Sequence, residues 1–303
     1  MKRFAGIFTP IATPFAADDS LDEAGLRSNV ARWMATPLTG LVVLGSNGEA
    51  PQLDDEEADR VIAIARAEMP RNRPMIVGTG REATRATIAA TRRAAALGAD
   101  AALVRTPSFF KAQMTTDVFV RHYLEVAEAS PIPVLLYNVT MYTGVNLPPD
   151  AVATLATHPN IVGMKESGGD LAQIAEYIAR TPDDWTVLAG SAATFFPALC
   201  AGCDGAVLAL AQLAPEACVK MRALVQAGRV DEARALQRRL APLARSIGGQ
   251  HGVPALKAAL TLMGYAGGAP RPPLRAVGPQ VVDILKSQLD ALGLVEQVPQ
   301  LQQ

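Results

Sequence analysis

Two kinds of segment alternate along this chain, and their repetition limits what it can fold into. Short apolar runs rich in β-branched residues take turns with longer, alanine-rich amphipathic stretches. The apolar runs are continuous, which is typical of strands buried on both faces in a parallel sheet covered by helices. Eight such runs occur, at residues 6–10, 40–45, 75–80, 101–107, 133–138, 161–166, 185–191 and 205–211.

Between these runs the spacing of apolar residues predicts amphipathic helices. We expect helices at residues 54–69, 82–98, 114–130 and 170–180. Eight strand–helix units predict an α/β fold, a closed (β/α)8 TIM barrel spanning residues 1–224. A doubly wound open sheet is the alternative, but no Gly-x-Gly-x-x-Gly follows the first strand, which counts against its dinucleotide-binding form.

After Leu224 the strand signals stop. Three helical stretches follow at residues 230–247, 253–265 and 277–294, with a proline- and glycine-rich connector at 267–274. The sequence therefore predicts a second domain of three helices over residues 225–303.

Bulk composition excludes several classes of function. The chain has 303 residues and a formal net charge of −1, with both signs dispersed, so no footprint for nucleic acid or an anionic membrane is present. No apolar run reaches the length of a membrane span. Pro10 and Pro14 interrupt the apolar stretch near the N-terminus, so we interpret it as a strand, not a signal peptide, and expect a cytoplasmic protein.

The three cysteines do not predict a disulfide framework, because their number is odd and small. Cys200 and Cys203 have the spacing of a redox or half-zinc motif, but no second pair completes a metal site. We expect buried structural thiols and no metal.

Lys165 is the strongest catalytic candidate, because it ends the sixth apolar run and barrel chemistry sits at the C-terminal ends of strands. An apolar interior disfavours the ammonium and favours a neutral amine, which can condense with a ketone as a Schiff base. The resulting iminium accepts electrons, so no organic cofactor is required. From the lysine alone, a structural ion pair with a carboxylate such as Glu166 is equally compatible.

Two further strand ends offer matching groups. Tyr137 ends the fifth apolar run and offers a phenol for general acid–base catalysis, or simply an aromatic packed in the barrel mouth. The stretch GSNGE at residues 45–49 offers a hydroxyl, an amide and backbone N–H groups for a carboxylate, or an ordinary Asn-Gly turn. His122, His158 and His251 are far apart in sequence and form no recognised motif.

Taken together, GSNGE, LLYNV and VGMKESGGD resemble the pyruvate-dependent class I aldolases and lyases, a family that includes dihydrodipicolinate synthase and N-acetylneuraminate lyase. The likeness extends to GIFTPIATPF near the start and to PALKAALTLMGY and RPPL near the end, so it covers nearly the whole chain. The resemblance implies a (β/α)8 barrel with a C-terminal helical domain, usually assembled as a homotetramer.

Carried over by position, the resemblance also implies roles for individual residues. Lys165 would form the Schiff base and Tyr137 would shuttle protons. The others would bind substrate, with Ser46 also joining the proton relay: Ser46, Asn47, Gly48, Gly190 and Val207.

Two departures from the synthases stand out. Tyr142 occupies the place of an arginine that grips the carboxylate of their aldehyde substrate, and a phenol does not supply that bidentate, charged grip. Phe109 and Phe110 stand where many members have a tyrosine pair whose hydroxyl completes the proton relay.

Within the family, the chain most resembles the 4-hydroxy-2-oxoglutarate aldolases, in GSNGE, HPNIVGMKESGGD and VLAGSA. That likeness makes Ser167 a further substrate contact, although a helix N-cap is an equally good interpretation. We therefore predict a carbon–carbon lyase that cleaves or forms a 2-oxo-4-hydroxy acid with pyruvate as one partner. The alternatives are a dihydrodipicolinate synthase-like condensing enzyme, a sugar-acid dehydratase, or a keto-acid-binding protein without turnover.

Overall fold

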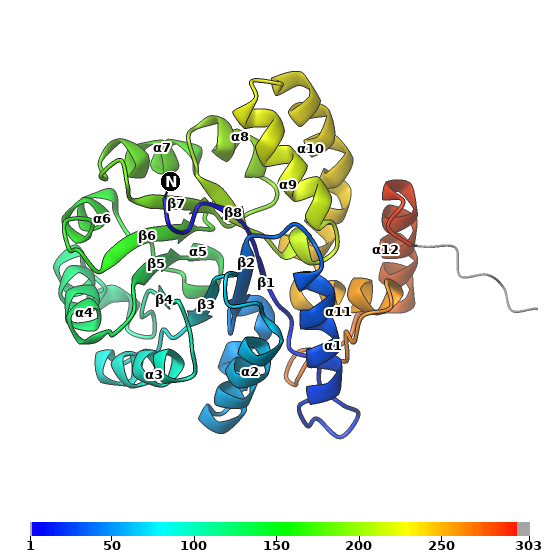
Figure 1. Cartoon of the computed structure of the whole chain (residues 1–303), viewed down its shortest axis with the longest axis horizontal. Helices are drawn as coiled ribbons and strands as arrows, with labels where there is room; N and C mark the ends of the chain where they lie inside the picture. The colour runs from blue at the N-terminus through cyan, green and yellow to red at the C-terminus, as the bar shows by residue number, and fades with distance from the viewer. Residues whose placement is uncertain (1, 296–303) are drawn as a thin grey trace, which may run out of the picture.

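Eight parallel strands close into a barrel in the order of the sequence, and each pairs with the next until β8 pairs with β1 (Figure 1). The computed structural model describes residues 2–295. The strands are β1 (Gly6–Pro10), β2 (Gly40–Val43), β3 (Met75–Gly78), β4 (Ala101–Arg105), β5 (Val134–Asn138), β6 (Ile161–Glu166), β7 (Thr186–Ala189) and β8 (Gly205–Val207). All eight predicted strands are present, and the predicted barrel is confirmed.

Helices surround the barrel, and a further group lies to one side of it (Figure 1). The surrounding helices are α1 (Glu23–Met34), α2 (Asp55–Glu68), α3 (Thr84–Ala96), α4 (Thr116–Ala129), α5 (Thr140–Thr143), α6 (Pro149–Leu155), α7 (Leu171–Ala179), α8 (Phe195–Cys200) and α9 (Pro215–Gln226). The C-terminal group is α10 (Val230–Arg245), α11 (Gly252–Leu262) and α12 (Pro279–Leu292). Short turns are the 3₁₀ helices η1 (Ser46–Gly48), η2 (Ala50–Gln52), η3 (Lys111–Gln113) and η4 (Ala209–Gln212), and the π-helical η5 (Ser246–Gln250).

The four helices predicted within the barrel are α2, α3, α4 and α7, while α1, α5, α6, α8 and α9 were not predicted individually. Helix α2 shows why the sequence signals worked. The Asp54 side chain accepts from the Glu57 N–H, and the Glu57 side chain accepts from the Asp54 N–H in return. This capping box satisfies N–H groups that have no partner within the helix.

Two apolar clusters divide the core. The smaller cluster takes its residues from the strands and the segments beside them and none from the helices, so it fills the barrel interior: Phe4, Phe8, Val42, Ile76, Ala101, Leu103, Leu135, Tyr137, Val139, Leu188 and Val207. The larger cluster joins the outer faces of the strands to the helices. Aromatic and branched side chains fill the barrel interior, which is therefore a packed core and not a pore.

Side chains of the C-terminal helices bind the barrel next to its mouth. On α10, Gln237 donates to the Ala192 carbonyl over 2.9 Å and accepts from the Phe196 N–H over 3.2 Å. On α11, Lys257 forms a buried ion pair with Glu49, with 2.7 Å between Nζ and Oε1. The predicted division into residues 1–224 and 225–303 stays a prediction, and residues 296–303 lie outside the described part of the chain.

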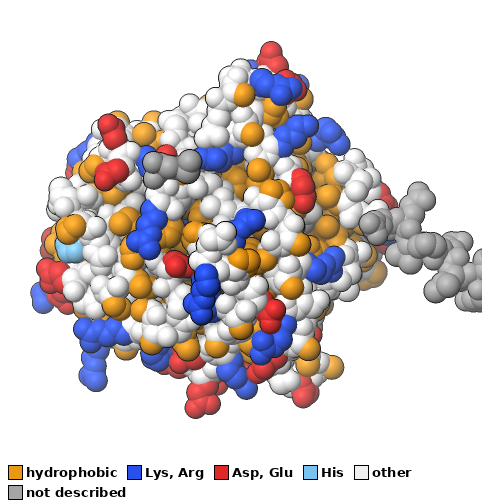
Figure 2. Space-filling model, viewed as in Figure 1, with side chains coloured by type: hydrophobic (Ala, Val, Ile, Leu, Met, Phe, Trp, Pro, Cys, Tyr) orange, Lys and Arg blue, Asp and Glu red, His pale blue; other side chains and the backbone are white. Residues whose placement is uncertain are grey.

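The surface in Figure 2 carries positive and negative side chains interspersed over the visible face. Within residues 2–295, no helix has the length and apolar character needed to cross a membrane. Cys203 and Cys218 are buried, as predicted, whereas Cys200 is exposed, so the prediction of a buried thiol is wrong there. Cys200 is the last residue of the six-residue helix α8, and the short helix leaves its end open to solvent.

Candidate active site

Lys165 and Tyr137 meet at the mouth of the barrel because their strands are neighbours in register. Tyr137 on β5 pairs directly with Lys165 on β6. The Lys165 amine donates to the Tyr137 hydroxyl over 3.3 Å, and Nζ lies 4.4 Å from the centre of the phenol ring. The two residues are only 3% and 5% exposed. The predicted pair of amine and phenol is therefore brought together in a buried setting.

Glu166 lies on the other side of the same strand, since successive side chains of a strand point to opposite faces. Its carboxylate accepts from Asn138 Nδ2 over 2.7 Å and from the Gly168 N–H. Burial raises the pKa of the Glu166 carboxyl, and these hydrogen bonds act in the opposite direction. Lys165 forms no ion pair with any residue of the described chain, so the alternative pairing with Glu166 does not occur.

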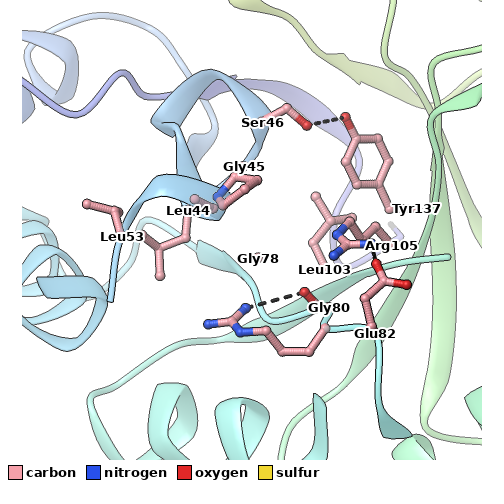
Figure 3. Close-up of a pocket in the computed structure, with 13 residues that line it drawn as sticks. Leu44, Gly45, Ser46, Leu53, Gly78, Gly80, Glu82, Leu103, Arg105 and Tyr137 are labelled. Atoms are coloured by element: carbon pink, nitrogen blue, oxygen red, sulfur yellow. Dashed lines mark hydrogen bonds and ion pairs between the residues drawn. The ribbon is translucent and has the colours of Figure 1, made fainter. Parts of the chain in front are cut away.

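Ser46 extends the contact from the phenol to a second strand end. It begins the 3₁₀ turn η1 directly after β2, and its hydroxyl lies 3.4 Å from the Tyr137 hydroxyl (Figure 3). Both residues line a cavity of about 370 Å³. On its other side this cavity is bordered by Arg105, paired with Glu82 over 2.7 Å.

A larger cavity of about 510 Å³ lies on the Lys165 side of Tyr137. It brings together six of the predicted site residues: Asn47, Tyr137, Lys165, Ser167, Gly190 and Val207. Ser46 lines only the smaller cavity, so Tyr137 forms a wall shared by both. Gly48 lines neither cavity; it is buried, and its carbonyl accepts from the Thr13 hydroxyl over 2.7 Å.

Ser167 faces the larger cavity and does not cap a helix. The N-cap of α7 is Asp170, whose carboxylate accepts from the Ala172 and Gln173 N–H groups. The Ser167 hydroxyl oxygen is buried and has no hydrogen-bond partner in the described chain. Gly190 makes room for it, because a Cβ at that position would collide with this oxygen. A buried hydroxyl without a partner, in a residue that lines the cavity, makes Ser167 a candidate contact for a bound molecule.

Sequence reasoning missed the part of the cavity wall that comes from the C-terminal helices. Arg245, at the end of α10, lines the larger cavity together with Gly248, Gly249 and Gln250 of η5. These residues are not at strand ends, so the rule that locates barrel chemistry could not find them. Tyr142, recognised from the sequence, also lines this cavity and is 56% exposed.

The arrangement agrees with comparisons to known proteins. Residues 3–292 match the model of the dihydrodipicolinate synthetase family. The chain belongs to this family. It is 38% identical over 295 residues to the 4-hydroxy-tetrahydrodipicolinate synthase of Methanothrix thermoacetophila. The matched region covers 96% of this chain and 99% of that protein. The corresponding protein of Methanopyrus kandleri is 36% identical, covering 97% and 98%.

Solved structures of the dihydrodipicolinate synthetase family show the same fold. The crystal structure of dihydrodipicolinate synthase from Thermotoga maritima has a TM-score of 0.92 at 31% identity, covering 96% of this chain and 99% of that one. A monomeric dihydrodipicolinate synthase variant has a TM-score of 0.89, also at 31% identity, covering 97% and 98%. The prediction of a carbon–carbon lyase of the pyruvate-dependent class I aldolase type is confirmed by this membership.

Among residues 2–295, no group of three or more His, Cys, Asp or Glu side chains is placed to hold a metal ion. His122 is buried in α4, where its Nδ1 lies 2.9 Å from the Thr84 hydroxyl, and it belongs to no such group.

Proposed function

We propose that Lys165 forms an imine with pyruvate, or with the pyruvyl part of a larger 2-oxo acid. The observation that carries the proposal is a buried amine, without a carboxylate partner, 3.3 Å from the Tyr137 hydroxyl at the wall of a cavity of about 510 Å³. A nucleophile in contact with a proton-transferring group is the usual arrangement for covalent catalysis.

The chemistry follows from the positions of these groups. The Lys165 amine attacks the 2-oxo carbon, and a water molecule leaves to give an iminium ion. Loss of a proton from the neighbouring carbon gives an enamine, which attacks an aldehyde to form a carbon–carbon bond, and hydrolysis frees the amine. In the reverse direction the C3–C4 bond breaks and its electron pair enters the iminium.

We assign each proton transfer to Tyr137. Its hydroxyl contacts the Lys165 amine and the Ser46 hydroxyl, over 3.3 Å and 3.4 Å, so protons can pass from the reacting atoms to the serine. The 3₁₀ turn η1 leaves its first N–H groups without partners inside the turn. We assign these groups, with Asn47 and Ser167, to the substrate's carboxylate and oxygen atoms.

Condensation and cleavage are two directions of the same chemistry, and different observations support each. The relatives described above are named as 4-hydroxy-tetrahydrodipicolinate synthases, which favours condensation of pyruvate with the aldehyde precursor of that product. Tyr142 at the cavity wall, in place of a guanidinium, favours the second candidate, cleavage of 4-hydroxy-2-oxoglutarate to pyruvate and glyoxylate. The family comparison gives condensation the first place.

Trapping with borohydride tests the shared step. Reduction in the presence of pyruvate is expected to fix one adduct on Lys165, found by peptide mass spectrometry, and Lys165→Arg should abolish it. An adduct on a different lysine, or none, would refute the proposal. Pyruvate consumption with the aldehyde precursor and pyruvate release from 4-hydroxy-2-oxoglutarate then separate synthase from aldolase. An imine with no turnover of any acid would leave a keto-acid-binding protein.

The assembly and location are also proposals. We propose a homotetramer in the cytoplasm, in which the large apolar side chains exposed at the barrel mouth are covered: Phe109, Phe110, Met141 and Tyr142. Light scattering with sedimentation tests the assembly, and a monomer at micromolar concentration would contradict it.

A further inference from the structure

The larger cavity contains one cation that the proposed chemistry does not use. Arg245 and Lys165 are the only basic residues among those that line it, and none of the lining residues is acidic. Once Lys165 has reacted with a 2-oxo group, its nitrogen is covalently occupied. Arg245 then remains as the one guanidinium facing the bound molecule.

The fold holds Arg245 at this wall from outside the barrel. Hydrogen bonds of Gln237 fix helix α10 to Ala192 and Ala193 in the loop after β7 and to Phe196 at the start of α8. Two turns further along α10, Ala244 and Arg245 both reach the cavity. Ala244 is buried and Arg245 is exposed, so the helix presents its charged side chain at the open rim.

Arg245 has no competing partner within residues 2–295. No ion pair and no hydrogen bond connects its side chain to another described residue, whereas Arg229 and Arg234 near the start of α10 pair with Glu232 and Asp231. It also ends α10, where a positive charge interacts favourably with the helix dipole. That interaction alone would not require a side chain at the wall of the cavity.

We propose that Arg245 is a specificity-determining residue that binds a second carboxylate, at the end of the substrate remote from the 2-oxo group. The inference rests on the proposed imine function and names the class of substrate, a 2-oxo dicarboxylic acid or its equivalent made from a carboxylate-bearing aldehyde. A guanidinium binds a carboxylate through two parallel hydrogen bonds, which an uncharged wall does not provide. A cavity of about 510 Å³ leaves room for this second half beyond a pyruvyl group.

A matched pair of acids tests the proposal. 2-Oxoglutarate and 2-oxopentanoate have the same chain length and the same 2-oxo group, and they differ in the distal carboxylate. We expect the wild type to bind 2-oxoglutarate more tightly in calorimetry. Arg245→Gln should weaken the binding of 2-oxoglutarate by about 10- to 100-fold, which is the size of one charge-assisted contact. The affinity for 2-oxopentanoate should stay within about twofold of the wild-type value.

Two further variants separate charge, geometry and fold. Arg238→Gln removes an exposed arginine of the same helix that lines neither of the two cavities at the barrel mouth, and it should change neither affinity. Arg245→Lys keeps the charge without the planar fork, so it should lie between the wild type and Arg245→Gln. Thermal melting of all variants monitors the fold.

The outcomes distinguish this inference from the proposed function. If the wild type binds both acids equally, or if Arg245→Gln weakens both equally, the assignment of Arg245 is overturned even though Lys165 still traps pyruvate. If the discrimination is lost in Arg245→Gln but borohydride finds no adduct on Lys165, the carboxylate site stands and the imine function fails.

Discussion

Replacing Lys257, the buried lysine of α11, by methionine should destabilise the folded chain. Lys257 and Glu49 are 0% and 1% exposed, and their charged atoms are 2.7 Å apart. Lys257 also donates to the Thr13 carbonyl over 2.9 Å, and Glu49 also accepts from the Arg271 N–H over 2.8 Å. Methionine preserves the bulk of the aliphatic stem but leaves the Glu49 carboxylate buried without its cation.

The expected cost is about 3–5 kcal/mol of unfolding free energy, the range for removing one partner of a buried pair. Replacing both partners, as Lys257→Met with Glu49→Gln, removes both charges and should recover most of the loss, because an amide oxygen still accepts from the Arg271 N–H. Denaturant unfolding of both variants and the wild type gives these values, provided that the slope with denaturant is unchanged.

A catalytic effect should accompany the loss of stability. Glu49 follows the turn over Ser46 to Gly48 directly, and its backbone is left-handed at φ 55°. Without Lys257 the side chain of Glu49 keeps only the hydrogen bond from the Arg271 N–H. The left-handed backbone is then less well held, so Ser46 should be less well positioned and kcat should fall even where the variant is fully folded. A single variant that costs less than about 1 kcal/mol would refute the reasoning, as would a double variant that costs as much as the single one.

Three other predictions concern the site and the pH dependence of stability. Tyr137→Phe should lower kcat by about 10²- to 10⁴-fold while borohydride still traps pyruvate on Lys165; an unchanged kcat would rule out the proton-transfer role. Gly190→Ala should slow adduct formation, since its Cβ would lie 2.9 Å from Lys165 Cε, whereas Gly249→Ala at the same cavity, with no atom within 4 Å, should not. Burial lowers the pKa of His122 from 6.5 to about 4, so between these pH values the unfolded chain binds a proton that the folded chain does not. The free energy of unfolding should therefore fall by about 3 kcal/mol as the pH decreases from 6.5 to 4. His122→Gln should flatten that part of the pH profile, measured by denaturant titration at each pH.

The barrel was predictable because each strand carries its own signal. A run such as residues 40–43 is apolar and buried on both faces, and only a strand covered on both sides accommodates it. Helices with clear caps and stops, such as α2, were also found. Helix α8 was not, since its six residues complete fewer than two turns and show no period.

In the candidate site, too, residues with a local sequence signal were predicted and the others were not. Lys165 and Tyr137 were found because they lie at strand ends, and the barrel closes those ends around one mouth. Arg245 was missed because its position depends on how α10 docks against the loop after β7, through Gln237. No local pattern in the sequence encodes such a contact between segments about 45 residues apart. The alternative that the sequence left open, a Lys165–Glu166 ion pair, does not occur because adjacent residues of a strand face opposite ways.

The position of Tyr137 between two cavities bears on the missing hydroxyls at Phe109 and Phe110. A proton taken up by the phenol must leave it, and the Ser46 hydroxyl at 3.4 Å opens into the smaller cavity. That cavity is bordered by Arg105 and Glu82, and the Glu82 carboxylate accepts from the Phe109 N–H over 2.8 Å. The loop that carries the phenylalanines is thus held at the rim of the cavity through its backbone, which needs no side-chain hydroxyl. The polar rim of the smaller cavity can hold water. In the proposed mechanism, a proton route through this water needs only Tyr137 and Ser46 from the protein.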